Sequence, residues 1–272
     1  MLRDFAGKER QMANKPLAYA GPIAADDGRR RFLGGVLGGS LGTGLMGLAG
    51  DAAARPAACL LTPALTEGPF YIDQALLRRD IRDGRPGQLL QLRLVVVDTD
   101  RGCAPVDGAL ASIWHCDAGG SYSGYDQGSM PPPPAGGPGQ GRGPGAGPDG
   151  GGMHAVPASA ARFLRGVQPT GPDGATQFLT IYPGWYAPRA VHIHLKIHLG
   201  KTEVLTTQLF FDDALSREVH LQHAAYRARG ASPVQNAQDG IAGARPNLLR
   251  VRRLRDADGT LEGEFTLGIA RA

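Results

Sequence analysis

The sequence lacks several features that would place it in common functional classes. It holds only three cysteines among 272 residues and none of them forms a CxxC pair, which disfavours a structural zinc site. It has no HExxH motif, the pair of histidines that many zinc hydrolases carry on a helix, and no internal repeat. Neither sign of charge is in large excess. Residues 55–272 carry 22 Lys or Arg against 20 Asp or Glu, which argues against nucleic acid as the main partner.

Glycine and proline, by contrast, are abundant. The chain has 41 glycines and 21 prolines, and 42% of its residues are hydrophobic, so it can bury a core but is unsuited to a long helical bundle. Residues 131–152 hold seven prolines and ten glycines, and we interpret them as a flexible insertion between two strands. This insertion is either an inert surface loop or a lid near a site.

The first 54 residues have the layout of a twin-arginine export signal. Arg29-Arg30-Arg31 precedes a glycine-rich apolar run over residues 34–50, and three alanines before residue 55 supply a cleavage site. A transmembrane helix is one alternative, but the run is short and weakly hydrophobic for a span. Lipid attachment at Cys59 is another. We therefore expect residues 1–54 to direct export to the periplasm, and the mature chain to have no stable membrane span.

The pairing of the three cysteines stays open at this point. In an oxidising compartment Cys103 and Cys116 could form a disulfide if their strands are neighbours, which would leave Cys59 free.

Short hydrophobic runs separated by Gly, Pro and Asp dominate residues 55–272. Residues 88–98 place leucine and valine at every second position, the period of a half-buried strand. Residues 214–226 are the best helix candidate, with Leu215 and Val219 along one stripe. The pattern predicts an all-β domain, an antiparallel β-sandwich with long loops and at most one or two short helices. Further strands are expected over residues 109–114, 177–182, 191–199, 206–211 and 264–269.

The stretch from Val191 to His198 carries the most specific chemical signal. Apolar residues alternate with His192, His194, Lys196 and His198, so in a strand the histidines share one face. Next-but-one residues of a strand lie roughly 7 Å apart, close enough for two imidazoles to bind one ion. Taken alone, such a pair on a strand is more often two satisfied polar side chains than a metal site.

Two tyrosines follow turns near this strand in the sequence. Tyr186 comes directly after a Pro-Gly-Trp turn, and Tyr122 ends a Gly-Gly-Ser turn, with Tyr125 as a competing candidate close by. Phenolate is a hard, charged oxygen donor that suits a ferric ion better than zinc or copper. Considered singly, each tyrosine is better explained as a core aromatic with a hydrogen-bonded hydroxyl.

Several motifs occur in one order between residues 60 and 211. They are EGPFY at 67–71, PVDGA at 105–109, IWHCDAGGSYSGY at 113–125, FLRGVQPTGPDG at 163–174, TIYPGWYAPRAVHIH at 180–194 and TQLFF at 207–211. This ordered set resembles the intradiol ring-cleavage dioxygenases, the family that includes protocatechuate 3,4-dioxygenase and catechol 1,2-dioxygenase. Two departures are Gly171, where the family often has aspartate, and the insertion at 131–152.

The resemblance implies a mononuclear non-haem Fe(III) held by Tyr122, Tyr186, His192 and His194. It further implies that Tyr186 detaches when a catechol binds, and His198 lies outside the ligand set. The expected reaction uses O2 to cleave a catechol-type ring between its two hydroxylated carbons, giving a cis,cis-muconate-type diacid without nicotinamide or flavin. The resemblance also implies that Arg189 lies over the substrate ring and that Gln208 lines the pocket.

Two other functions stay open on the sequence. The chain could be an exported β-sandwich binding module that kept the fold without iron, although all four candidate ligands are present. It could also be a zinc-dependent hydrolase using His192, His194 and His198, but no carboxylate base stands beside these histidines. The identity of the catechol and the oligomeric state cannot be read from the pattern.

Overall fold

The computed structural model describes residues 60–73, 76–125, 155–255 and 259–271, all within one unit of the chain, Ala52–Ala272. The predicted export signal at 1–54, Cys59 and the insertion at 131–152 lie outside the described residues and stay predictions. Within the described ranges, no helix combines the length and the apolar character needed to cross a membrane.

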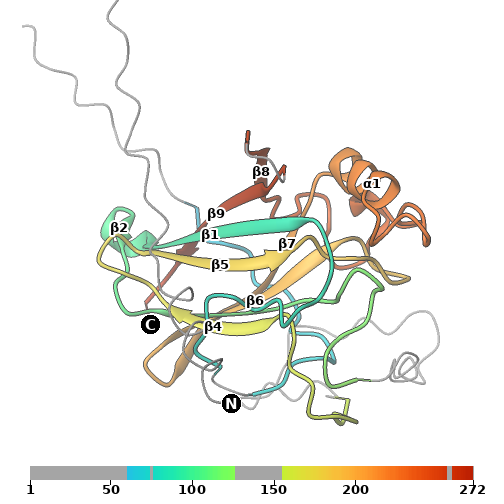
Figure 1. Cartoon of the computed structure of the whole chain (residues 1–272). Helices are drawn as coiled ribbons and strands as arrows, with labels where there is room; N and C mark the ends of the chain where they lie inside the picture. The colour runs from blue at the N-terminus through green and yellow to red at the C-terminus, as the bar shows by residue number, and fades with distance from the viewer. Residues whose placement is uncertain (1–59, 74–75, 126–154, 256–258, 272) are drawn as a thin grey trace, which may run out of the picture. The chain divides into compact units, whose positions relative to one another are not determined.

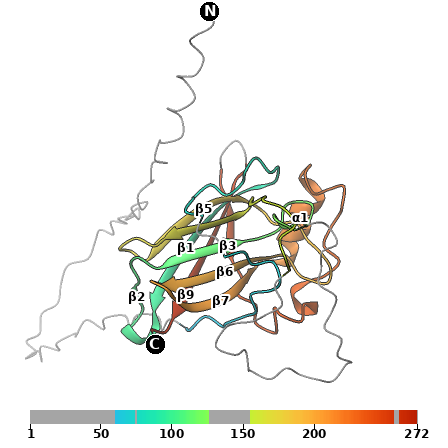
Figure 2. The same ribbon diagram turned by 90° about the horizontal axis from the view of Figure 1, so that it is seen from below.

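Two β-sheets form the body of the described unit (Figures 1 and 2). In the five-stranded sheet the order is β2-β1-β9-β8, and β5 also pairs with β1; in the four-stranded sheet the order is β4-β3-β6-β7. The predicted all-β sandwich is confirmed, with one qualification: β1 and β9 run parallel, the single such pair among the described strands. The strands are β1 (Leu89–Asp98), β2 (Ala104–Pro105), β3 (Leu110–Trp114), β4 (Arg165–Pro169), β5 (Ala175–Ile181), β6 (His192–Leu199), β7 (Thr202–Phe210), β8 (Arg250–Arg253) and β9 (Leu261–Ile269).

The core lies between the sheets because alternate residues of the central strands face one another. Leu92 and Leu94 of β1 and Ile193 and Leu195 of β6 are almost fully buried and belong to one hydrophobic cluster. Burying one such side chain stabilises the fold by roughly 1.5–3 kcal/mol. Alternation therefore turns the remaining residues of β6, the histidines among them, toward the outer face of the four-stranded sheet.

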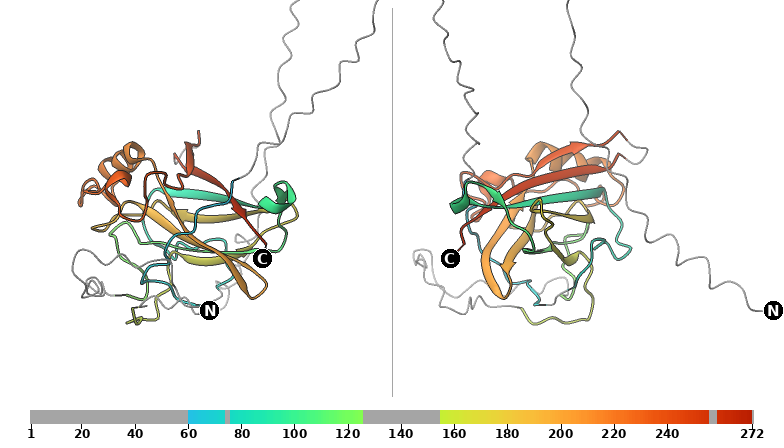
Figure 3. Two further views of the ribbon diagram at one scale, coloured as in Figure 1. Left: turned by 180° about the vertical axis from the view of Figure 1, so that it is seen from behind. Right: turned by 90° about the vertical axis from the view of Figure 1, so that its left-hand side faces the viewer.

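One α-helix, α1 (Asp213–Gln222), lies at one end of the sheets (Figures 1 and 3). Asp212 caps it by accepting a hydrogen bond from the Leu215 backbone N–H, as expected for a residue that precedes the first helical turn. The helix ends four residues earlier than the sequence predicts, because His223 is extended, but Tyr226 beyond it is still buried. Two short 3-10 turns complete the elements, η1 (Thr99–Arg101) and η2 (Asn236–Gln238).

Three strands were missed by the sequence analysis. The edge strand β8 has the sequence RVRR: its three arginines are exposed, and the single apolar residue Val251 is too little to give a periodic pattern. β2 is only two residues long. β4 contains Gly166, where a Cβ would lie 2.5 Å from Ile81, so a close approach of the chain replaces the expected side chain.

The disulfide considered between Cys103 and Cys116 does not form. Cys103 is disulfide-bonded, whereas Cys116 is a free, buried thiol. The reason is their placement: Cys103 lies between η1 and β2, at the edge of the five-stranded sheet, while Cys116 follows β3 of the other sheet. Burial raises the pKa of Cys116 to about 12, which leaves an inert thiol that donates to the Gly184 carbonyl.

Candidate metal centre

The candidate centre is built on the outer face of the four-stranded sheet. His192 and His194 alternate along β6 with the core residues Ile193 and Leu195, and both imidazoles are buried by the segments that cover this face. Hydrogen-bonded register places Trp114 of β3 and Gln208 of β7 on either side of His194. The expected strand geometry of the two histidines is thus present.

The four predicted ligands meet around the Nε2 atom of His192. That nitrogen lies 3.4 Å from the Tyr122 hydroxyl, 3.2 Å from the Tyr186 hydroxyl and 3.1 Å from Nε2 of His194. Donor atoms that bind one ion at about 2 Å stand about 3–3.5 Å from one another. The spacing therefore fits a single small cation between two phenols and two imidazoles.

The histidines present the chemical form that a metal requires. Nδ1 of His192 lies 2.6 Å from the Ala190 carbonyl oxygen, which can only accept, so this nitrogen carries the proton and Nε2 keeps its lone pair. The His194 ring stacks on Trp114 with centroids 5.0 Å apart, and its buried Nδ1 has no hydrogen-bond partner. Burial lowers the pKa of His192 to about 3 and that of His194 well below its ordinary value, so both are neutral.

The tyrosines are neutral without a cation nearby. Burial raises the pKa of Tyr186 to about 12 and that of Tyr122 well above its ordinary value. Removing these protons requires a strong positive charge between the hydroxyls, which a trivalent ion supplies. Because phenolate is a hard donor, the set of two phenolates and two imidazoles suits a ferric ion better than zinc. The residues present therefore fit the metal that the family resemblance implies.

Glycine contacts hold the two tyrosine-bearing loops together. The Gly184 N–H donates to the Asp117 carbonyl at 3.1 Å, and a Cβ on Gly184 would overlap the Asp117 and Ala118 carbonyls. Gly120, with a φ of +84°, packs in the same way against the Trp185 carbonyl. The loop before Tyr122 and the loop before Tyr186 therefore position each other.

A network of hydrogen-bonded polar groups holds the Arg189 side chain. Its Nε donates to Asp239 at 2.9 Å, and its terminal nitrogen donates to the Gln208 amide oxygen at 2.5 Å. Gln208 in turn donates to the Thr66 carbonyl. The structure therefore brings Arg189 and Gln208 into contact. That Arg189 lies over the substrate ring and that Gln208 lines the pocket stay predictions. Asp239 was missed, because its only local signal is an Asp-Gly pair typical of any turn.

The competing candidates lie apart from the cluster. Tyr125 donates its hydroxyl to the Tyr71 carbonyl, at 3.1 Å, instead of turning toward the histidines. His198 follows a register shift in β6. Across the part of the chain that the structure describes, no group of three or more His, Cys, Asp or Glu side chains could hold a metal ion. A zinc hydrolase built on His192, His194 and His198 is therefore not supported.

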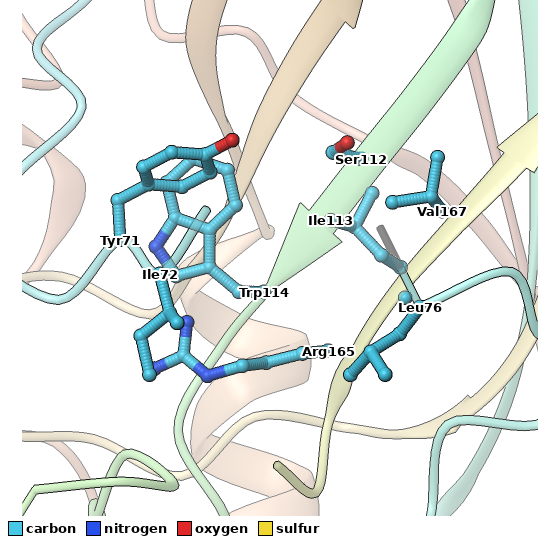
Figure 4. Close-up of a pocket in the computed structure, with 9 residues that line it drawn as sticks. Tyr71, Ile72, Leu76, Ser112, Ile113, Trp114, Arg165 and Val167 are labelled. Carbon is cyan, nitrogen blue, oxygen red and sulfur yellow. The ribbon is translucent and has the colours of Figure 1, made fainter. Parts of the chain in front are cut away.

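A separate pocket opens on the same outer face (Figure 4). Its lining comes from the segment before β1, with Tyr71, Ile72 and Leu76, and from strands β3 and β4, with Ser112, Trp114 and Arg165 among others. Trp114 belongs to both places, since its ring lines the pocket and stacks on His194. None of the four candidate ligands lines this pocket, so it is distinct from the space between them.

Comparison with known proteins agrees with the family resemblance seen in the sequence. No protein-family model matches the chain. A catechol 1,2-dioxygenase from Acinetobacter lwoffii is 30% identical over 159 residues, which is 56% of this chain and 51% of that protein. A solved intradiol ring-cleavage dioxygenase from Tetranychus urticae superposes with a TM-score of 0.64 at 29% identity, covering 78% of this chain and 95% of that one. The dioxygenase domain of a carbohydrate-binding fusion protein from Streptomyces sp. SirexAA-E gives 0.51 at 26% identity, covering 78% and 99%.

These similarities confirm the resemblance that the ordered motifs predict. The chain is similar in sequence to catechol 1,2-dioxygenases and in fold to intradiol ring-cleavage dioxygenases. It spans about half the length of the curated relatives that it matches.

Proposed function

We propose that this chain, related in sequence and in fold to the intradiol ring-cleavage dioxygenases, is itself an iron-dependent enzyme that cleaves catechol-type rings with O2. One observation carries the proposal: the two hydroxyls and two imidazole nitrogens of Tyr122, Tyr186, His192 and His194 converge at mutual spacings that fit one ion between them. The product would be a cis,cis-muconate-type diacid, and both oxygen atoms of O2 would enter it.

The four converging side chains would hold Fe(III). When bound, the ferric ion supplies Lewis-acid activation of the aromatic diol, drawing electron density from the ring so that O2 can attack it. Two phenolates supply two of the three negative charges that a trivalent ion requires, so the partly buried site need not hold a large unpaired charge.

The two tyrosines have different tasks in this proposal. Tyr122 is buried and stacks on Phe70 with ring centroids 4.6 Å apart, so it has little freedom to move. Tyr186 is only partly buried and follows a loop. Tyr186 would therefore be the tyrosine that can turn away, its phenolate oxygen accepting a substrate proton to become a neutral phenol.

Arg189 would stabilise negative charge on the substrate. Its guanidinium is held at two points, by Asp239 and by Gln208, and its side chain is 11% exposed. A cation fixed in advance beside the place where charge develops stabilises the transition state without reorganising. Gln208 contributes by holding that orientation and by lining the site.

The decisive experiment is an oxygen-electrode assay of the purified, iron-loaded protein over a panel of catechol, protocatechuate, hydroxyquinol and halogenated catechols. We expect one O2 consumed per ring cleaved, with no need for nicotinamide or flavin, and a red-brown visible absorption band from ferric tyrosinate. A colourless protein that binds catechol without consuming O2 would favour the alternative of a non-catalytic binding module. The panel also identifies the preferred catechol.

We also propose that the protein is exported to the periplasm, on the strength of Arg29-Arg30-Arg31 and the apolar run that follows. Fractionation of cells expressing the full chain, with the N-terminus of the product determined, tests this. Cleavage near residue 54 is expected, whereas an intact chain retained in the cytoplasm would refute export.

A further inference from the structure

The loop after α1 reaches the candidate centre through one carboxylate. We propose that Asp239, directly after η2, is a positioning residue that fixes both Arg189 and the peptide that orients His192. The inference rests on the proposed function, because it assigns a role toward the same centre. Asp239 lies outside residues 60–211, the region over which the motifs resemble the family.

The Asp239 carboxylate accepts four hydrogen bonds. Its Oδ2 accepts from Nε of Arg189 at 2.9 Å and from the Ala190 N–H at 2.7 Å. Its Oδ1 accepts from the backbone N–H groups of Ile241 and Ala242, at 2.8 and 3.1 Å. The side chain is 0% exposed, so these four donors replace water entirely. One oxygen is thus used to hold the carboxylate in its own loop, and the other to hold residues 189 and 190.

The first arm of this arrangement controls the arginine. Asp239 and Gln208 grip the Arg189 guanidinium from two directions, and Gln208 is itself fixed to the Thr66 carbonyl. Asp239 also balances the charge of a guanidinium that would otherwise be nearly buried and unpaired. Without the carboxylate, Arg189 would be held by Gln208 alone and its charge would be unpaired.

The second arm reaches a metal ligand. Ala190 donates its N–H to Asp239, and its carbonyl accepts the Nδ1 proton of His192 at 2.6 Å. A hydrogen bond at Nδ1 fixes the tautomer and ring orientation of a ligating histidine. Asp239 therefore acts on His192 through one peptide unit, and on the substrate side through Arg189.

The test is a double-mutant cycle in the full chain, with D239N, R189Q and the double variant. Asparagine keeps the shape of the side chain but offers an NH2 group in place of one accepting oxygen, and it removes the charge. In the iron-loaded protein, anaerobic titration of the visible band with catechol gives the dissociation constant, and the oxygen electrode gives kcat and KM. D98N is the matched control: Asp98 is equally buried and forms an ion pair with Arg271, but lies in β1 of the other sheet.

We expect D239N to retain the visible band while its catechol affinity and kcat/KM fall about 10–100-fold, as is typical for the partner of a ligating or substrate-binding group. In the R189Q background the same change should cost clearly less than in the wild type, since the contact with Arg189 is already gone and only the contact with the Ala190 N–H remains to be lost. D98N should keep wild-type values. Wild-type affinity and turnover in D239N, or a loss that adds in full to that of R189Q, would overturn the proposal.

Two further measurements separate this inference from the proposed function. In the metal-free protein, amide hydrogen exchange at Ala190, Ile241 and Ala242 should become faster in D239N. This result does not depend on whether the wild-type protein binds iron or catechol. Unchanged exchange at Ala190 would refute the contact between Asp239 and the Ala190 N–H. If D239N does not fold, R189K probes the same contact from its other side. Lysine keeps the charge but replaces the planar guanidinium, whose Nε and terminal nitrogen bond Asp239 and Gln208 separately, with one compact ammonium. Catechol affinity should therefore still fall at least about tenfold, and wild-type affinity in R189K would refute the arrangement.

Discussion

The two pairs of candidate ligands are built in different ways. His192 and His194 are next-but-one residues of β6, a strand with β3 on one side and β7 on the other, so the backbone ladder fixes their spacing. Tyr122 and Tyr186 lie on loops outside any strand, and these loops are held against each other by glycine contacts. The sheet therefore supplies the rigid half of the site, and the loops supply the half that can adjust.

This difference bears on what each pair can do. A ligand in the middle of a sheet cannot move without breaking the ladder, whereas a ligand on a loop can change position at a small cost. If Tyr186 leaves the ion when substrate binds, as we propose, it is the loop pair that permits the movement. The histidines then keep the ion in place throughout.

Removing a histidine should have the largest effect. In H192A one of the two imidazoles of the rigid pair is lost, so iron affinity should fall by more than the roughly 10–100-fold typical for an outer partner. Iron content after dialysis against a chelator measures this. H198A is the control on the same strand and should retain iron as the wild type does; equal iron loss in both variants would contradict the assignment.

Removing a phenol should weaken iron binding less but change the colour more. Y122F and Y186F each keep the ring and its packing and lose one charged oxygen donor, so the visible band should shift or bleach and O2 uptake with catechol should be abolished. Y125F is the matched control, because that hydroxyl bonds only the Tyr71 carbonyl among the hydrogen bonds described. Full activity in Y122F or Y186F would refute its role as a ligand.

A change between the loops should disturb both tyrosines at once. In G184A the new Cβ meets the Asp117 and Ala118 carbonyls, and the overpacking costs about 1–3 kcal/mol. Because the histidines stay in place, we expect iron still to bind, about tenfold more weakly, with an altered visible band. G171A, where the nearest atom would lie at an ordinary 3.4 Å, is the control. An unaltered band in G184A would show that the two loops are positioned independently.

The metal-free protein should lose stability as the pH falls. Burial, followed by the charge of Arg189, lowers the pKa of His192 to about 3, against an ordinary value of 6.5. Below pH 6.5 the unfolded chain binds a proton that the folded chain refuses, so stability is full above pH 6.5 and falls toward pH 3 by up to about 1.4 kcal/mol per pH unit. Urea unfolding at pH 7, 5.5 and 4.5 should give a shallower decline in H192Q; identical slopes would contradict a neutral, buried His192.

The same comparison explains how far the sequence could predict the site. Alternation along residues 191–198 is a local pattern, so the shared face of His192 and His194 follows from strand geometry alone. The meeting of Tyr122 with Tyr186 depends on how two loops pack, and only the family resemblance predicted it. Neither the local pattern nor the family resemblance predicted Asp239. It contacts Arg189 across 50 residues of chain, and no local pattern specifies the path of the loop that carries it.

The strands that the sequence predicted also differ from those that it did not. Strands with one buried face, such as β1 and β6, were predicted nearly to their ends, because their hydrophobic period records the core. The parallel pairing of β1 with β9 and the exposed edge strand β8 were not, since neither leaves a periodic signal in its own residues.

The most direct test of the central claim is a crystal structure of the iron-loaded protein with an anomalous difference map at the iron absorption edge. We expect a single iron peak at bonding distance from the phenolic oxygens of Tyr122 and Tyr186 and from Nε2 of His192 and His194. Iron bound elsewhere, or a different metal at this place when the protein is isolated from iron-replete cells, would contradict it.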